Sequence, residues 1–191
     1  MVRAAVSVSN VPVFCNDFVV YGYQLFRAKS SGADAVKLMA SVLPTQDIEY
    51  LLKIAKALGL QCIVVVSSKV QLLEVLRAVP AVQALSVSSR NMRLWKIDAG
   101  KAARILKDPE VAAAIAAKRR DAAAATAATA AAGSGFSDGD FILLQEAFTS
   151  HAELVEAGAN GVDAIILGEE LLLGKEAGIK ATIEQWKQQV L

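Results

Sequence analysis

Short apolar runs alternate with stretches of helical character along most of the chain. Each run is four to six residues long and is followed by a segment with a helical pattern. Apolar runs of this length are typical of strands that are buried on both faces, as in a parallel sheet. Six such units therefore predict an α/β fold built on a parallel sheet. The predicted strands are Val11–Phe14, Ala35–Ala40, Cys62–Val66, Ala84–Val87, Phe141–Leu144 and Val162–Leu167.

The segments between the strands carry start and stop signals of helices. Gly32 and Gly59 directly follow two predicted helices, and Thr45 is the expected N-cap of the second. The same kind of turn is expected to lead from a helix into a strand at two places. It reads Ser-Gly-Ala-Asp at 31–34 and Asn-Gly-Val-Asp at 160–163. No Gly-x-Gly-x-x-Gly motif follows the first strand, which disfavours a dinucleotide-binding fold. The predicted helices span Tyr21–Ser31, Thr45–Leu58, Ser68–Ala78, Ala99–Leu106, His151–Ala157 and Ile179–Val190.

Composition narrows the partners and cofactors to be expected. The chain has 20 Lys and Arg against 19 Asp and Glu, which argues against nucleic acid or an anionic membrane as a partner. No apolar run reaches the roughly 18 residues that a membrane-spanning helix needs. Cys15 and Cys62 lie in apolar runs and indicate core residues of a reducing compartment, while the single histidine, His151, is expected to be exposed. We therefore expect no metal and no cofactor.

One segment departs from the alternation. Residues 112–132 contain 14 alanines in 21 positions, interrupted by the charged residues 118–121, and run into Gly-Ser-Gly at 133–135. Alanine has the highest helix propensity, so part of the segment is expected to be helical, but alanine buries little surface. The favoured interpretation is an expanded surface loop that lengthens one connection, and the alternative is a docking arm for a partner.

Several motifs occur in the order and spacing of one enzyme family. The most specific part is the stretch from 12 to 76, which opens with Pro-Val-Phe-Cys-Asn-Asp-Phe at 12–18 and contains further matches at 23–36 and 63–67. Beyond it, matches lie at 87–92, which reads Val-Ser-Ser-Arg-Asn-Met, and at 144–148 and 162–169. These motifs resemble strands three to eight of indole-3-glycerol-phosphate synthase. The third and sixth strands of that enzyme read Pro-Val-Leu-x-Lys-Asp-Phe and Ile-Asn-Asn-Arg-Asp-Leu.

The resemblance implies an incomplete (β/α)8 TIM barrel with six βα units. Residues 1–10 are then an N-terminal extension, and residues 11–191 are a partial barrel domain with an alanine-rich insertion at about 110–138. The family's strands one and two have no counterpart, so the first and last strands would each present an unpaired edge that needs a cover. A longer parent chain, a partner subunit or a different closure of the sheet would meet that need.

The resemblance also locates the family's catalytic groups, and most of these positions hold another residue. The enzyme closes an indole ring with loss of carbon dioxide and water, which requires a cationic general acid, carboxylates and a phosphate cradle. Asn16 stands at the acid lysine, Val65 at the strand-five carboxylate and Ser88 at the strand-six asparagine. Ala147 and Phe148 replace the phosphate-binding Ser-Gly pair, and we expect the phenyl ring to fill the pocket or to turn the loop away.

A few residues of the family's site are retained. Glu146 keeps the strand-seven carboxylate, Arg90 persists at the rim, and Gly168 with Glu169 corresponds to the phosphate site of strand eight. Glu146 and Arg90 are expected to form a structural ion pair. Lys37 adds a cation to strand four, where it would reach the bottom rim, pair with a carboxylate, face an outer helix or act as a relocated catalytic lysine.

These replacements predict a non-catalytic relative of the synthase, a pseudoenzyme that serves as a structural or docking subunit. Its expected partners are protein subunits that cover the sheet edges, and a small phosphate ligand is not expected. The alternatives are a functional synthase whose missing groups come from elsewhere, and a sensor that binds a sugar phosphate without chemistry. Residues 1–10 are basic and free of acids, as in the tail of a transit peptide, and family analogy indicates a plastid.

Overall fold

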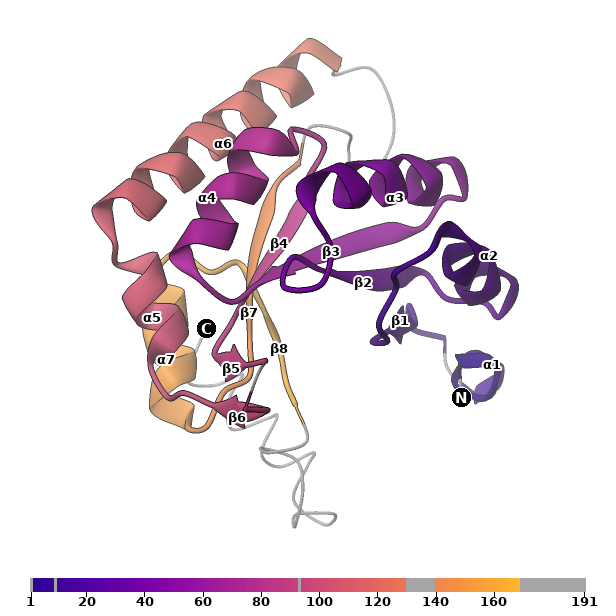
Figure 1. Cartoon of the computed structure of the whole chain (residues 1–191), viewed down its shortest axis with the longest axis horizontal. Helices are drawn as coiled ribbons and strands as arrows, with labels where there is room; N and C mark the ends of the chain where they lie inside the picture. Colours follow the sequence, from indigo (N-terminus) through magenta and orange to yellow (C-terminus); the bar gives the residue numbers. More distant parts are fainter. Residues whose placement is uncertain (1, 9, 93, 130–139, 169–191) are drawn as a thin grey trace.

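Six parallel strands form one curled sheet in the order β1-β2-β3-β4-β7-β8 (Figure 1). The computed structural model describes residues 2–8, 10–92, 94–129 and 140–168. A separate antiparallel hairpin is formed by β5 and β6. The strands are β1 (Phe14–Cys15), β2 (Ala35–Met39), β3 (Gln61–Val66), β4 (Ala84–Ser88), β5 (Arg90–Asn91), β6 (Lys96–Ile97), β7 (Ile142–Glu146) and β8 (Ala164–Ile166).

Helices cover the convex face of the sheet, and within the described residues each of the strands β1, β2, β3, β4 and β7 is followed in the chain by at least one helix (Figure 1). The main apolar core lies between the strands and these helices. This arrangement confirms the predicted strand–helix alternation and the incomplete barrel. The helices are α1 (Val2–Val8), α2 (Gly22–Ser30), α3 (Thr45–Ala57), α4 (Lys69–Ala78), α5 (Lys101–Leu106), α6 (Pro109–Thr129) and α7 (His151–Ala159).

Alternate residues of each strand face the helices or the hollow of the curl. On β2, Val36 and Leu38 are fully buried in the core beneath the helices, so Lys37 between them faces the hollow. On β3, Val64 and Val66 lie in the same core. The hollow is therefore lined by the second set of side chains from each strand, and this set carries the polar residues of the barrel interior.

The turns that lead into β2 and β8 share one construction, as predicted. Each contains a glycine with positive φ, 90° in the first turn and 77° in the second, a conformation that glycine adopts without strain. Asp34 Oδ2 accepts a hydrogen bond of 2.7 Å from the backbone N–H of Val13. Asp163 Oδ2 accepts one of 2.8 Å from the N–H of Leu143. In both turns the aspartate thus fastens its strand to the preceding strand of the sheet.

Through residue 129 the alanine-rich segment is helical, as expected for part of it, and this helix lengthens one connection of the barrel. α6 spans 21 residues and occupies the crossover between β4 and β7. Pro109 opens it, and Asp108 Oδ1 accepts hydrogen bonds from the next two backbone N–H groups. Val111 and Ile115 are four residues apart on one face and are both buried. Alanine propensity and this small apolar face together favour the helix over the loop.

Cationic side chains attach α6 to the bottom of the barrel. Lys118 donates a hydrogen bond of 2.6 Å to the carbonyl of Pro80. Arg119 donates to the carbonyl of Gly161 and to the carboxylate of Asp163, each at 2.7 Å. The charged interruption in the alanine run is therefore the part that anchors the helix.

Other differences from the sequence prediction are local. Pro44 rather than Thr45 is the N-cap residue of α3, and Thr45 is the first helical residue. The β5–β6 hairpin was not predicted, because two strands of two residues each are too short to show alternation. The predicted helix at 179–190 lies outside the described residues.

Candidate functional site

A cavity of about 400 Å³ opens in the hollow of the curl, at the carboxyl ends of the strands. In closed α/β barrels this end holds the ligand site. Five polar residues line the cavity, namely Asn16, Asp17, Lys37, Arg90 and Glu146. Its apolar wall consists of Phe18, Met39, Met92, Trp95 and Leu167. The cavity therefore joins residues from β2, β7, the hairpin and the loops after β1 and β8.

An ion pair crosses the hollow between β2 and β7. Lys37 Nζ lies 3.2 Å from Glu146 Oε1 and 3.1 Å from Oε2, and the two side chains are 13% and 11% exposed. Two strands separate β2 from β7, a distance of about 14 Å in a flat sheet. The register places Lys37 level with Ile142, four residues before Glu146, so the tilt and curl of the strands bring the two charges together.

The cation that bonds Glu146 is thus Lys37 rather than the expected Arg90. Arg90 instead points its guanidinium to the hairpin, where Nη1 donates to the carbonyl of Trp95 at 3.3 Å. The same guanidinium lies 5.3 Å from the centroid of the Trp95 ring, within range of a cation–π interaction. Of the roles considered for Lys37, the structure shows pairing with a carboxylate inside the barrel.

The hairpin and the loop after β1 meet at the mouth of the cavity. The rings of Trp95 and Phe18 contact each other with centroids 6.3 Å apart. Trp95 has a φ of 55°, which is uncommon for a residue with a side chain. Phe18 and Met92 end two of the family motifs, but the sequence analysis did not predict that they line a cavity. Trp95 lies in no motif, and no periodic pattern marks the short hairpin that carries it.

The three positions that are expected to replace catalytic groups have different surroundings. Asn16 is exposed and lines the cavity. Val65 is only 2% exposed and does not line it. Ser88 is fully buried, and its hydroxyl accepts a hydrogen bond of 3.2 Å from the backbone N–H of Arg90. Only Asn16 therefore presents a polar group to the cavity.

The phenyl ring of Phe148 does not fill the cavity, which corrects one of the two predicted outcomes. Phe148 is 1% exposed and packs against Leu154 and Ala157 of α7 in a small separate core. Ala147 before it has a φ of 63°, a left-handed conformation that costs a residue with a Cβ about 1–2 kcal/mol. The chain thus turns at Ala147 and carries the ring beneath α7.

The structure describes some of the remaining predicted site residues and not others. Gly168 lines the cavity, while Glu169 lies outside the described residues. His151 begins α7, and its side chain is outside the described part of the chain. Within the residues that the structure describes, no three His, Cys, Asp or Glu side chains gather as a metal site. None of the helices in this same part is long and apolar enough to cross a membrane.

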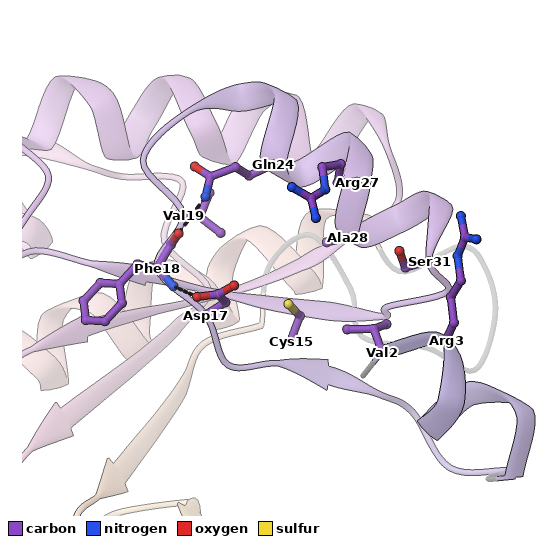
Figure 2. A pocket seen from close by; sticks show the side chains of 10 residues that line it. All are labelled: Val2, Arg3, Cys15, Asp17, Phe18, Val19, Gln24, Arg27, Ala28 and Ser31. Carbon is purple, nitrogen blue, oxygen red and sulfur yellow. Dashed lines mark hydrogen bonds between the residues drawn. The ribbon is translucent and has the colours of Figure 1, made fainter.

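A second cavity, of about 350 Å³, lies on the other side of the loop after β1. It is bounded by α1, β1 and α2, and Figure 2 shows Arg3 and Arg27 on its walls together with the thiol of Cys15. Asp17 and Phe18 line both cavities, so this loop is the partition between them. Asp17 Oδ1 accepts a hydrogen bond of 2.8 Å from the N–H of Phe18, which holds the partition in shape.

Comparison with known proteins finds relatives along nearly the whole chain. The family model described as indole-3-glycerol phosphate synthase matches residues 1–128. The protein of that name from Acaryochloris marina is 30% identical over 188 residues, which cover 98% of this chain and 52% of the relative. The Microcystis aeruginosa protein of the same name is 30% identical over 172 residues, 90% of this chain and 49% of the relative. The chain thus spans about half the length of these curated relatives.

Solved structures agree on the fold. A 3-hexulose-6-phosphate synthase from Salmonella typhimurium superimposes with a TM-score of 0.60 at 16% identity, over 100% of this chain and 80% of that one. A mandelate oxidase gives a TM-score of 0.61 at 14% identity, over 99% of this chain and 59% of that one. At such identities the likeness concerns the barrel architecture alone.

Proposed function

The chain belongs to the indole-3-glycerol phosphate synthase family, and we propose that it is a non-catalytic member that serves as a structural subunit of a larger assembly. The observation that carries the proposal is the state of Glu146, the retained carboxylate. Its Oε2 lies 3.1 Å from Lys37 Nζ across the hollow. The residues at the replaced positions, Asn16, Val65 and Ser88, supply no charged group to this interior. A carboxylate held in this way supports the barrel through its ion pair with the Lys37 ammonium.

The groups that the family's reaction requires are replaced by groups that cannot perform its proton transfers. The amide of Asn16 carries no charge and does not protonate a leaving hydroxyl. The side chain of Val65 has no proton to transfer, and the hydroxyl of Ser88 is occupied by the N–H of Arg90. Because each general acid or base contributes about 10²- to 10⁴-fold, losing several of them together removes any useful rate.

The phosphate cradle is altered as well. A glycine at that turn lets backbone N–H groups approach a phosphate closely. Here Phe148 holds the position, and its burial against α7 fixes the turn in a packed state. This packing supports a structural role for the loop and weighs against a sugar-phosphate sensor.

Exposed apolar residues near the sheet edge support a docking role. Within the described part of the chain, β1 ends the sheet on one side with two residues and β8 ends it on the other with three. Val11, Tyr23 and Phe26 near the β1 edge are all more than half exposed. Unpaired edges and apolar side chains of this kind are usually covered in a native assembly. We include in the proposal protein subunits that cover these edges, and a plastid location, which the cyanobacterial relatives support.

One observation favours a second candidate, a synthase with altered machinery. Lys37 brings an ammonium group into the cavity from β2, where the family carries its acid lysine on the strand that corresponds to β1. In this alternative Lys37 is the relocated general acid and Glu146 its partner.

Complementation of a strain that lacks the synthase tests the proposal, with the Microcystis aeruginosa relative as the positive control. We expect no growth from the native full-length protein and no indole fluorescence when it is mixed with the phosphorylated substrate. Robust turnover would overturn the proposal, and its loss in a Lys37→Met variant that circular dichroism shows to be folded would identify the altered synthase. A sensor would show thermal stabilisation by a ribulose-phosphate analogue, which we do not expect at millimolar concentration.

The assembly is tested separately by size-exclusion chromatography of the native protein. We expect elution in a complex well above the 20.1 kDa of one chain. A stable isolated monomer would contradict the docking role while leaving the loss of catalysis untouched.

A further inference from the structure

In the hollow, Lys37 brings together a nucleophilic amine, the proton-accepting carboxylate of Glu146 and an accessible cavity. Its Nζ lies within hydrogen-bond distance of both oxygens of Glu146. Both residues also line the cavity of about 400 Å³, so a small molecule in that cavity lies beside the amine. We infer that Lys37 forms an imine with small aldehydes or ketones that enter the cavity, with Glu146 as the proton carrier.

The covalent step balances without any further reactant. The Glu146 carboxylate takes one proton from the Lys37 ammonium, and the freed electron pair of Nζ forms a bond to the carbonyl carbon. The carbonyl π pair moves to oxygen, which takes that proton from Glu146. Glu146 then removes a second proton from nitrogen and delivers it to the hydroxyl, which leaves as water. The product is an iminium that keeps the third proton, and Glu146 returns to its charged form.

The walls of the cavity suit this chemistry. Met39, Met92 and Leu167 are apolar and reduce the water around the reacting carbon, which slows hydrolysis of the imine. Lys37 is carried by a strand of the sheet and its amine is bonded to Glu146, which keeps the amine at the wall of the cavity. The inference is independent of the synthase reaction, because imine formation uses neither the family's acid position nor its phosphate cradle.

A second lysine–glutamate pair provides an internal control. Lys107 Nζ lies 2.6 Å from Glu156 Oε1, but these side chains are 59% and 37% exposed and line none of the cavities described above. The two pairs therefore share a carboxylate at hydrogen-bond distance and differ in their surroundings. If carbonyl compounds react faster with Lys37 than with Lys107, the difference must come from the cavity and from the position of Lys37 inside the barrel.

Reductive trapping tests the inference on the native full-length protein. The protein is incubated briefly with glycolaldehyde and sodium cyanoborohydride at neutral pH, and each labelled lysine is located by peptide mass spectrometry. We expect Lys37 to gain the hydroxyethyl group at least about tenfold faster than Lys107, in line with the effect of one placed acid–base group. Glu146→Gln should remove that advantage, whereas Glu156→Gln should leave the labelling of Lys37 unchanged.

Two results would overturn the inference. The first is labelling of Lys37 at the same rate as Lys107 in the unmodified protein, a comparison that does not depend on any variant folding. The second is an unchanged Lys37 rate in Glu146→Gln, once circular dichroism shows that this variant is folded. Absence of synthase activity bears on neither result, so this inference and the proposed function fail separately.

Discussion

Arg119 of α6 and Asp163 of the turn before β8 form an ion pair with 2.7 Å between Nη2 and Oδ2. The same Asp163 oxygen accepts the backbone N–H of Leu143, so one carboxylate joins the crossover helix, the turn and β7. The side chains of the pair are 38% and 44% exposed, and ion pairs in such positions contribute about 0–1 kcal/mol.

We predict that Asp163→Ala destabilises the fold by about 1–3 kcal/mol, because it leaves the N–H of Leu143 without its acceptor. Arg119→Ala should cost less than about 1 kcal/mol. Asp34→Ala is the matched control, since Asp34 makes the equivalent bond to Val13. Urea unfolding followed by circular dichroism measures the free energy of unfolding of all three variants. A larger loss of stability in Arg119→Ala than in Asp163→Ala would contradict the role assigned to the Asp163 carboxylate.

We predict that Ala147→Gly stabilises the protein by about 1 kcal/mol, because glycine adopts the φ of 63° without the clash of a Cβ. Ala113→Gly in α6 is the control of opposite sign and should cost about 1 kcal/mol, since that alanine has ordinary helical geometry and is exposed. Thermal unfolding compares the two. Equal destabilisation by both variants would show that Ala147 is not strained.

Replacing one partner of the Lys37–Glu146 pair should destabilise the fold strongly, and replacing both partners should destabilise it less than the two single losses together. Lys37→Met alone or Glu146→Gln alone is expected to cost about 3–5 kcal/mol, because each leaves a nearly buried charge without its partner. The double variant should be more stable than the sum of the two losses implies. A double-mutant cycle from urea unfolding measures this coupling, and additive losses would mean that the two charges do not interact.

The two thiols should react at very different rates. Burial raises the pKa of the Cys62 thiol to about 12, so almost no thiolate exists at about pH 8. Partial burial and the charge of Asp17 raise the pKa of Cys15, whose thiol lines the second cavity and is partly exposed. With a disulfide reagent in excess, we expect Cys15 to react in the folded protein and Cys62 only after unfolding. Cys15→Ser should therefore show no reaction before denaturant is added.

The start of α6 should weaken in acid. Hydrogen bonds from Lys69 lower the pKa of Asp108 below its ordinary 3.8 and the pKa of Glu110 below its ordinary 4.5. The folded protein therefore binds these protons less readily than the unfolded chain, so the stabilisation is present above these ordinary values. It is lost as the pH falls through the lowered pKa values. Unfolding curves between about pH 7 and about pH 2 should be less pH-dependent in Lys69→Met, and identical pH profiles would exclude the contribution.

Much of the fold is readable from the sequence, because strands buried on both faces appear as apolar runs and glycines with positive φ close the helices before β2 and β8. The length of α6 was underestimated because the contact of this helix with the core depends on few large side chains, Val111 and Ile115, within a run of alanine. The β5–β6 hairpin left no periodic signal at all.

The sequence indicated which positions belong to the candidate site, but not the ion pair that forms in it. The positions of Asn16 and Ser88 follow from the spacing of the motifs around them. The partner of Lys37 does not, since Glu146 lies 109 residues away and two strands across. Only the curl of the sheet decides which charges meet in the hollow.

The sequence separation of 109 residues between Lys37 and Glu146 also bears on when this pair forms during folding. A contact between residues 109 positions apart closes a very long loop, so its entropic cost is met only after the intervening βα units have formed. Individual units can form from contacts near in sequence, whereas this pair forms only once β2 and β7 face each other. The pair is therefore a late event on the folding path, and substitutions in it should speed unfolding more than they slow folding.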